Sequence, residues 1–320
     1  MKFKPIIIIA GEPNSVFFEI FLKIIKKNKF KSPLILICSK KILFKQAKAL
    51  KEQININEID DDKIFLNNIK FKKLNLINVN YNQNKPFQKI SSKSNKYIKN
   101  SFDIGLKIIK NGISNKLING PISKEKFLKN KYVGITEYLA KKTNTKNFAM
   151  VIFNKKLSVS PIITHEPIKH VAKKINKSKI VNKIKIIDKF WKDNLKRKAR
   201  IAITGLNPHC ESTDKFNEDK KTILPAVNDL IKSKIRIKGP FSADTIFTKV
   251  NRNKFDLIIG MYHDQVLTPI KTLFEYDAIN LTIGLPFVRV SPDHGPNENM
   301  LGKKISKTTS LLKSIRFLDY

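Results

Sequence analysis

Short apolar runs alternate along this chain with longer amphipathic stretches that are rich in lysine. Such alternation predicts an α/β fold, in which largely parallel strands are joined by helices that cover the sheet. The expected strands are Pro5–Ala10, Leu34–Cys38, Lys116–Asn119, Ala149–Phe153, Ser158–Thr164, Ile201–Thr204, Leu257–Gly260 and Ala278–Thr282. The expected helices, from their spaced apolar residues, are Phe18–Lys27, Lys41–Lys51, Ser101–Asn111, Ile168–Leu195 and Lys221–Lys232.

The polar segments between these runs predict loops and one further helix. The stretch from Gln83 to Lys96 is polar and turn-rich, which predicts a long loop. The tail is rich in lysine and serine from Lys303 onward and becomes apolar at Leu311 and Leu312, so we expect it to dock as a last helix. The loop after the first strand, Gly11–Ser15, holds a single glycine. The absence of Gly-x-Gly-x-x-Gly there argues against a common Rossmann dehydrogenase.

Length and cysteine content set the broad class. A chain of 320 residues predicts about two domains of roughly 150 residues each. Its longest early apolar run, Ile6–Ala10, is far shorter than the ~18 residues that span a bilayer, and it lacks the features of a secretory signal. Two cysteines, Cys38 and Cys210, exclude a disulfide framework and suit a reducing compartment. We therefore expect a cytoplasmic protein without a membrane segment.

The net charge of +37 changes this picture less than its size suggests. Such an excess is typical of proteins that bind nucleic acid or an anionic surface. Here, however, 57 of the 63 basic residues are lysines scattered along the chain, and lysine, isoleucine and asparagine all have AT-rich codons. We interpret the charge as base composition displayed on a solvated surface, which argues against nucleic acid as a partner. A positive surface would still attract phosphorylated or carboxylated substrates.

Three of the five histidines, His165, His209 and His263, follow expected strands. Ligands of open α/β sheets bind beyond the carboxyl ends of the strands. Three imidazoles are also the ligand set of a metal site that keeps one position open for chemistry. Their wide spacing matches no local metal motif, so spacing alone favours three unrelated histidines. Whether they form a metal site therefore depends on the residues around each of them.

The segment from Gly260 to Pro296 carries the most chemical groups. His263 is followed by Asp264 and Gln265, which can fix the tautomer of an imidazole if they contact it. Arg289 lies between glycines and prolines and is one of only six arginines. A guanidinium binds phosphate or carboxylate through two parallel hydrogen bonds. The sequence leaves open whether Arg289 contacts a ligand or is an ordinary surface residue in a loop.

A series of short motifs occurs at these strand ends and in the loops between them. They are Gly11-Glu12-Pro13, Asn119-Gly120-Pro121-Ile122, Thr136-Glu137-Tyr138-Leu139-Ala140, Thr164-His165, Gly205-Leu206-Asn207-Pro208-His209, Gly239-Pro240, Ala243-Asp244-Thr245, Met261-Tyr262-His263-Asp264-Gln265, Gly284-Leu285-Pro286-Phe287, Arg289, Ser291 and Asp293-His294-Gly295. In this order they resemble the 4-hydroxythreonine-4-phosphate dehydrogenases. Tyr-His-Asp-Gln and Leu-Asn-Pro-His are the specific signals, and the resemblance covers most of the chain.

The resemblance implies two α/β/α subdomains similar to those of isocitrate and isopropylmalate dehydrogenases, which bind NAD without the usual glycine fingerprint. We expect residues 1–133 and 285–320 to form the first subdomain and residues 134–284 to form the second, which carries the metal histidines. The family likeness further implies a homodimer, with the active site in the cleft and at the dimer interface and with each metal site shared between subunits.

The implied activity is oxidation of 4-phosphooxy-L-threonine by NAD or NADP, with decarboxylation to 3-amino-2-oxopropyl phosphate, in vitamin B6 synthesis. The resemblance assigns one divalent metal per site (zinc, magnesium, manganese or cobalt) to His165, His209 and His263. It assigns substrate contacts to Thr136, Lys271, Asn280 and Arg289. The general acid or base stays unassigned, with Asp244, Asp264 and Lys271 as candidates.

One departure from the family bears on the substrate. Ile135 stands where the family has a substrate-binding histidine, and an alkyl side chain cannot replace the hydrogen bond, whose loss costs about 1–3 kcal/mol. A second hypothesis therefore keeps the same chemistry on a related phosphorylated hydroxy acid, such as threonate or erythronate 4-phosphate. A third hypothesis, ranked last, is a non-enzymatic protein that binds polyanions through its lysines.

Overall fold

The computed structural model describes residues 3–60, 68–128 and 132–320. It separates into two compact units. The first unit comprises Met1–Ile135 and Pro286–Tyr320, and the second comprises Thr136–Leu285. The sequence predicts these boundaries at 133/134 and 284/285. Within the described part of the chain, no helix combines the length and the apolar character that crossing a bilayer requires.

The sheet of the first unit is parallel throughout its described strands. Its strands follow the order β3-β4-β2-β1-β5-β12. Their bounds are β1 Ile6–Ile9, β2 Leu34–Cys38, β3 Ile56–Glu58, β4 Leu74–Asn78, β5 Lys116–Asn119 and β12 Val288–Pro292. Strands β1 and β2 are apolar and buried at every position, as expected for strands that helices cover on both faces.

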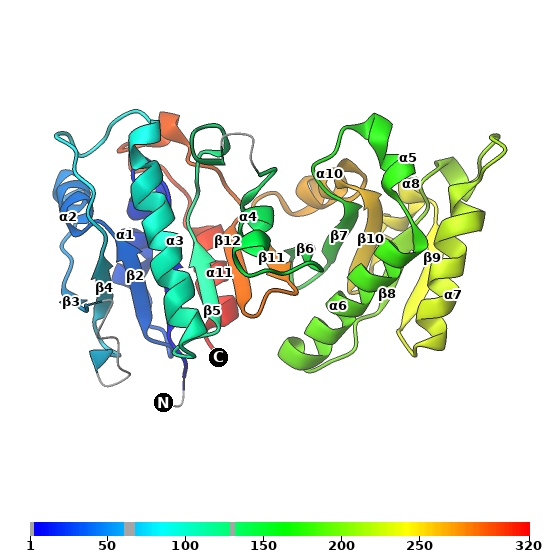
Figure 1. Ribbon diagram of the computed structural model, residues 1–320, viewed down its shortest axis with the longest axis horizontal. Helices are drawn as coiled ribbons and strands as arrows, with labels where there is room; N and C mark the ends of the chain where they lie inside the picture. Colours follow the sequence, from blue (N-terminus) through cyan, green and yellow to red (C-terminus); the bar gives the residue numbers. More distant parts are fainter. Residues whose placement is uncertain (1–2, 61–67, 129–131) are drawn as a thin grey trace. The chain divides into compact units, whose positions relative to one another are not determined.

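Helices cover both faces of this sheet. Their bounds are α1 Phe17–Lys27, α2 Lys40–Ala49, α3 Asn95–Lys110 and α11 Thr309–Leu318, with short turns at Ser92–Ser94, Lys124–Leu128 and Glu298–Met300. Helix α3 lies on one face, and α1, α2 and α11 lie on the other (Figure 1). The expected helix in the tail is confirmed as α11, and its Leu311 is buried. The loop expected from Gln83 to Lys96 is shorter in the structure, because helical structure already begins at Ser92.

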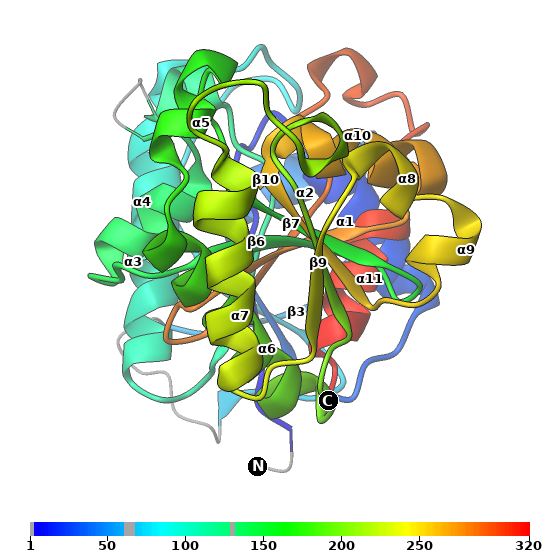
Figure 2. The same cartoon turned by 90° about the vertical axis from the view of Figure 1, so that its right-hand side faces the viewer.

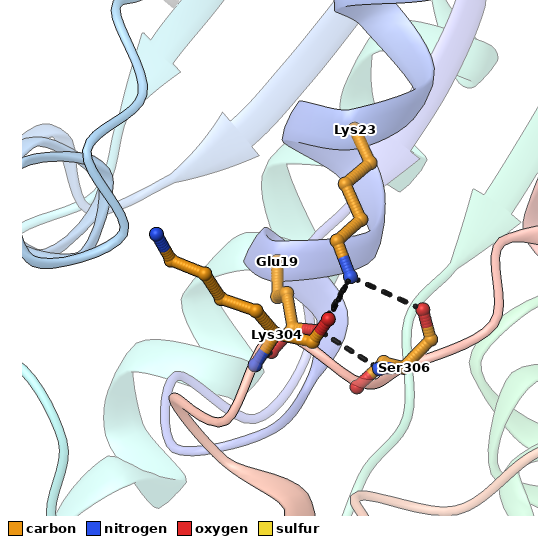
Figure 3. A network of polar contacts seen from close by, with 4 residues as sticks. All are labelled: Glu19, Lys23, Lys304 and Ser306. Atoms are coloured by element: carbon orange, nitrogen blue, oxygen red, sulfur yellow. Dashed lines mark hydrogen bonds and ion pairs between the residues drawn. The ribbon is translucent and has the colours of Figure 1, made fainter.

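The segment before α11 is fastened to α1 by a buried carboxylate, as Figure 3 shows. Glu19 is 3% exposed and accepts hydrogen bonds from the backbone N–H groups of Lys304 (3.1 Å) and Ser306 (2.9 Å). The Lys23 ammonium lies 2.8 Å from the same carboxylate and also donates to the Lys304 carbonyl. The burial of Glu19 is therefore compensated by charge-assisted hydrogen bonds to a distant segment.

The sheet of the second unit is mixed. Its strands follow the order β11-β6-β7-β10-β8-β9. Their bounds are β6 Ala149–Phe153, β7 Ser158–Ile163, β8 Ile201–Thr204, β9 Ile237–Phe241, β10 Leu257–Tyr262 and β11 Ile279–Ile283. Strand β6 is antiparallel to both β7 and β11, whereas β7, β10, β8 and β9 are parallel. The predicted α/β class is thus confirmed for both units.

The helices of the second unit are α4 Ile135–Lys142, α5 Val171–Lys174, α6 Lys177–Leu195, α7 Leu224–Lys232, α8 Ala243–Ile246, α9 Lys249–Arg252 and α10 His263–Phe274, with short turns at Ile168–His170, Pro208–Cys210 and Asp219–Ile223. Helices α6 and α7 pack together on one face of the sheet, and α8 and α9 lie on the other (Figure 2). A continuous helix over Ile168–Leu195 is wrong. Asn176 adopts an extended conformation and its side chain caps α6 by accepting from Lys179 N, so a new helix begins there.

Candidate metal and substrate site

The three histidines follow the carboxyl ends of three neighbouring strands in the sheet of the second unit. Strand β10 pairs in parallel with both β7 and β8, so the carboxyl ends of these three strands are adjacent. His165 follows β7, His209 follows β8, and His263 is the first residue of α10 after β10. The sequence predicts that each of these histidines follows a strand, and in the structure each one does.

Two of the three imidazoles lie together. The ring centroids of His165 and His263 are 5.7 Å apart, with the rings tilted by 39°. His209 lies on an exposed turn with a φ of +53°, in the left-handed region. Across residues 3–60, 68–128 and 132–320, no group of three or more His, Cys, Asp or Glu side chains has the arrangement of a metal site. In the described residues of this single chain, His165 and His263 thus lie together, and His209, after the neighbouring strand β8, does not complete a group of three with them.

Each of these rings has its Nδ1 directed toward an oxygen atom. His263 Nδ1 lies 2.6 Å from Asp264 Oδ1, and His209 Nδ1 lies 3.5 Å from Ser242 Oγ. His165 Nδ1 is buried 3.9 Å from the Glu137 carboxylate, without a hydrogen bond in the described structure. The Asp264 carboxylate at His263 Nδ1 favours the tautomer in which Nε2 of that ring carries the lone pair. The donor set therefore suits a divalent cation, which binds neutral imidazole through such a lone pair.

Glu137 lies in the first turns of α4 beside His165 and the side chain of Lys183. Burial raises the pKa of Glu137, but the facing imidazole, a backbone hydrogen bond and the Lys183 ammonium together outweigh burial and hold that pKa below its usual value. Burial also lowers the pKa of Lys183 to about 8, although its Nζ donates to the Ile162 carbonyl (2.7 Å). Glu137, Lys183 and Thr164 are among the residues that line a cavity of about 420 Å³.

The residues assigned to substrate binding belong to different units. In the second unit, Thr136 Oγ1 lies 3.2 Å from Thr282 Oγ1 on β11, and Asn280 on the same strand has a buried Oδ1 without a partner among the described residues. Burial lowers the pKa of Lys271, on α10. In the first unit, Arg289 lies in β12.

Arg289 is not an ordinary surface residue in a loop, and that alternative is wrong. It is 1% exposed within β12, which pairs in parallel with β5. Its Nε donates to Asn119 Oδ1 at the end of β5 (2.7 Å). A fully buried guanidinium requires hydrogen bonds or an opposite charge, and the contact with Asn119 supplies part of that compensation.

The candidate acids and bases differ in their surroundings. Asp264 is exposed and contacts His263. Asp244 is exposed at the start of α8, where a hydrogen bond from Ser242 and the charge of His209 hold its pKa below the usual value. Asp264 and Asp244 therefore lie beside two different members of the histidine set.

Sequence reasoning missed Glu137 and Ser242 as the oxygens that face His165 and His209. Glu137 belongs to a motif that carries the resemblance, and Ser242 lies directly before another, Ala243-Asp244-Thr245, but neither is near its histidine in sequence. Gln265, considered as a tautomer-fixing neighbour of His263, contacts the backbone of β10 and of the loop after β8 instead.

Comparison with known proteins places this chain in a family. The family model described as pyridoxal phosphate biosynthetic protein PdxA matches residues 29–318. The chain is 37% identical over 314 residues to a 4-hydroxythreonine-4-phosphate dehydrogenase of Sulfurihydrogenibium sp. (strain YO3AOP1), covering 96% of this chain and 95% of that protein. It is 34% identical over 186 residues to a D-threonate 4-phosphate dehydrogenase of Pectobacterium atrosepticum, covering 58% of this chain and 57% of the relative.

Solved structures agree. The crystal structure of 4-hydroxythreonine-4-phosphate dehydrogenase from Klebsiella pneumoniae superposes with a TM-score of 0.82 at 25% identity, covering 98% of both chains. The sequence match spans both units of the chain, and the structural match covers nearly all of it. The chain is therefore an oxidoreductase that belongs to the PdxA family of pyridoxal phosphate biosynthetic proteins.

Proposed function

We propose that this protein oxidises 4-phosphooxy-L-threonine with NAD or NADP and a divalent metal, and that decarboxylation then gives 3-amino-2-oxopropyl phosphate for vitamin B6 synthesis. The observation that carries the proposal is the pair of imidazoles of His165 and His263, 5.7 Å apart beyond neighbouring parallel strands. The names of the relatives supply the substrate class, a small phosphorylated hydroxy acid.

His165, His209 and His263 are proposed to hold one zinc, magnesium, manganese or cobalt ion. When bound, a divalent cation stabilises negative charge that develops on a substrate oxygen. Asp264 orients the His263 ring from the Nδ1 side, which leaves Nε2 for the metal, and the Glu137 carboxylate faces Nδ1 of His165 at 3.9 Å. We also propose a homodimer in which the site is shared between subunits, and a cytoplasmic location.

Four residues are proposed to bind the substrate. Arg289 and Lys271 are cations suited to its phosphate and carboxylate, and Thr136 and Asn280 are suited to its hydroxyl and amino groups. Lys271 is the proposed proton donor or acceptor, because burial moves its pKa toward neutrality, which improves a lysine as an acid or base at physiological pH. Asp264 interacts with His263 and Asp244 has a lowered pKa, so both are weaker candidates.

The test is NAD(P)H formation by purified, metal-loaded protein given 4-phosphooxy-L-threonine, beside a metal-stripped sample. Turnover should require the metal and should fall to background in His165→Ala. The matched control is His170→Ala, because His170 is exposed and only five residues further along the chain. Salt-sensitive binding of RNA without any metal-dependent turnover would instead support the polyanion hypothesis.

A second candidate substrate is D-threonate 4-phosphate or the corresponding erythronate. Ile135 favours it, because this first residue of α4 replaces a substrate-binding histidine, and the match to the Pectobacterium enzyme adds support. Parallel assays of the candidate substrates decide between them: a higher kcat/KM on the threonate or erythronate ester would replace the first proposal.

A further inference from the structure

We propose that Gln265 is a positioning residue that fixes the turn carrying His209 against the helix carrying His263. This inference rests on the proposed metal site and names a part of the chain that keeps its ligands in place. It concerns only the second unit, to which all three of these residues belong.

The side-chain amide of Gln265 joins the ends of two strands. Its Oε1 accepts hydrogen bonds from Met261 N (2.7 Å), in β10, and from Thr204 Oγ1 (2.8 Å), at the end of β8. Its Nε2 donates to the carbonyl of Gly205 (2.8 Å), the first residue after β8. Gln265 lies in the first turn of α10, two residues after His263. One side chain thus connects the start of the His209 turn with the start of the His263 helix.

These partners require an amide. The backbone N–H of Met261 can only donate and the carbonyl of Gly205 can only accept, so the orientation of the Gln265 amide is determined. A glutamate of the same size could accept at Met261 and Thr204, but its carboxylate would face the Gly205 carbonyl with no proton to donate. Replacing Gln265 by Glu therefore changes one hydrogen bond into a repulsion while it conserves the shape of the side chain.

A second side chain holds the same turn from the other side. Asp219, which is buried, accepts from Leu206 N (2.7 Å) through Oδ1 and from Asn207 N (3.2 Å) and Asn207 Nδ2 (2.9 Å) through Oδ2. Gly205 N donates to the Phe241 carbonyl (2.9 Å). A Cβ at Gly205 would lie 2.5 Å from Asp219 Oδ1, so a glycine is needed for this close packing.

The residues held by these hydrogen bonds, 205–207, lead into a turn with a strained backbone. His209 and the next residue, Cys210, have φ values of +53° and +61°. Residues with a Cβ adopt this left-handed conformation at a cost, and it persists where the surrounding structure imposes it. The hydrogen bonds of Gln265 and Asp219 supply that constraint directly upstream. Loosening them would let the turn that carries His209 move relative to the helix that carries His263.

The experiment titrates Co²⁺ alone into metal-stripped, full-length protein and follows the d–d absorption bands. Gln265→Glu should weaken Co²⁺ binding by about tenfold or more, as is typical when a residue that orients metal ligands is changed, and should alter the bands. Gln53→Glu, at an exposed position, is the charge-matched control and should leave affinity and bands as in the wild type. Thermal unfolding of each apo variant separates loss of the site from loss of the fold.

Thr204→Val provides a second variant should Gln265→Glu fail to fold. It keeps the shape of a buried side chain and removes one of the three hydrogen bonds, so a smaller shift in the same direction is expected. Unchanged Co²⁺ affinity and bands in Thr204→Val and in any folded Gln265→Glu would overturn the inference. Failure of the wild-type protein to bind Co²⁺ would overturn the proposed metal site, and this inference with it.

Discussion

The imidazole rings of His165 and His263 lie 5.7 Å apart because the strands that precede them run side by side. Ile163, the last residue of β7, pairs with Tyr262, the last residue of β10. Residues just beyond these ends must therefore meet, although they are far apart in sequence. Each ring also has a carboxylate on its Nδ1 side, and the closer of these is Asp264, at 2.6 Å from His263.

Substituting Asp264 distinguishes an orienting role from an acid–base role. Asp264→Ala removes the oxygen beside His263 Nδ1, so the ring loses both its fixed tautomer and part of its basicity. We expect metal affinity to fall about 10–100-fold, measured by competition with a chromophoric chelator. Asp193→Ala, an exposed carboxylate in the same unit, should leave the affinity unchanged. Reduced turnover with wild-type metal affinity would instead assign Asp264 to proton transfer.

Restoring a histidine at position 135 tests the substrate assignment. Ile135 is a half-buried first residue of α4, next to the substrate-binding candidate Thr136. If 4-phosphooxy-L-threonine is the substrate, Ile135→His should add a hydrogen bond of about 1–3 kcal/mol and raise kcat/KM at least about fivefold.

The matched control for that change is Val133→His, which also replaces a β-branched residue but at an exposed position. It should leave kcat/KM unchanged in steady-state assays. A gain in both variants would point to a general effect of the added imidazole, and a gain in neither would count against the first substrate.

The sequence predicts the elements whose signal is local. Strand β1 is a run of four isoleucines, and β-branched residues between a proline and a glycine leave few alternatives to a buried strand. The sequence does not predict strand β12, because Val288–Pro292 follows Pro286 closely, ends in a proline and contains Arg289, a combination typical of loops. It is a strand because it pairs with β5, and a pairing partner so distant cannot be inferred from local pattern. Helix α10 was missed because Pro269 lies inside it.

The candidate site likewise has one part that the sequence predicts and one part that it does not. Strand ends can be located from the sequence, so the three histidines could be placed at the edge of a parallel sheet. Their surroundings come from other elements: Glu137 reaches His165 from α4, and Ser242 reaches His209 from the end of β9. His209 has a left-handed φ of +53°, and a histidine in a sequence does not by itself show that its backbone adopts this conformation.

Glu19 should contribute measurably to the stability of the fold. Glu19→Gln removes the charge from a buried side chain that accepts from two backbone N–H groups and from Lys23. Hydrogen bonds to charged groups contribute about 1.5–3 kcal/mol each, so we expect a loss of at least about 1.5 kcal/mol in urea denaturation. Glu52→Gln, which breaks an ion pair with the largely exposed Lys26, should cost less than about 1 kcal/mol. Equal losses in the two variants would contradict this assignment.

Asp256 should make the stability of the protein fall at low pH. Burial alone raises the pKa of this carboxyl, but hydrogen bonds from Arg200, its backbone N–H included, and from Arg197 outweigh burial and lower the pKa from 3.8 to about 2. A carboxyl with a lowered folded-state pKa stabilises the protein above its unfolded pKa and loses that contribution as the pH falls through the folded value.

Asp256→Asn should therefore be less stable than the wild type at pH 6, and the difference in unfolding free energy should shrink as the pH falls from about 4 to about 2. The measurement is urea denaturation at a series of pH values in that window. Asp193→Asn, at an exposed position within the described structure, should follow the wild-type curve throughout. A difference between Asp256→Asn and the wild type that stays constant with pH would mean that packing around position 256, and not the charge of the carboxylate, stabilises this edge of the sheet.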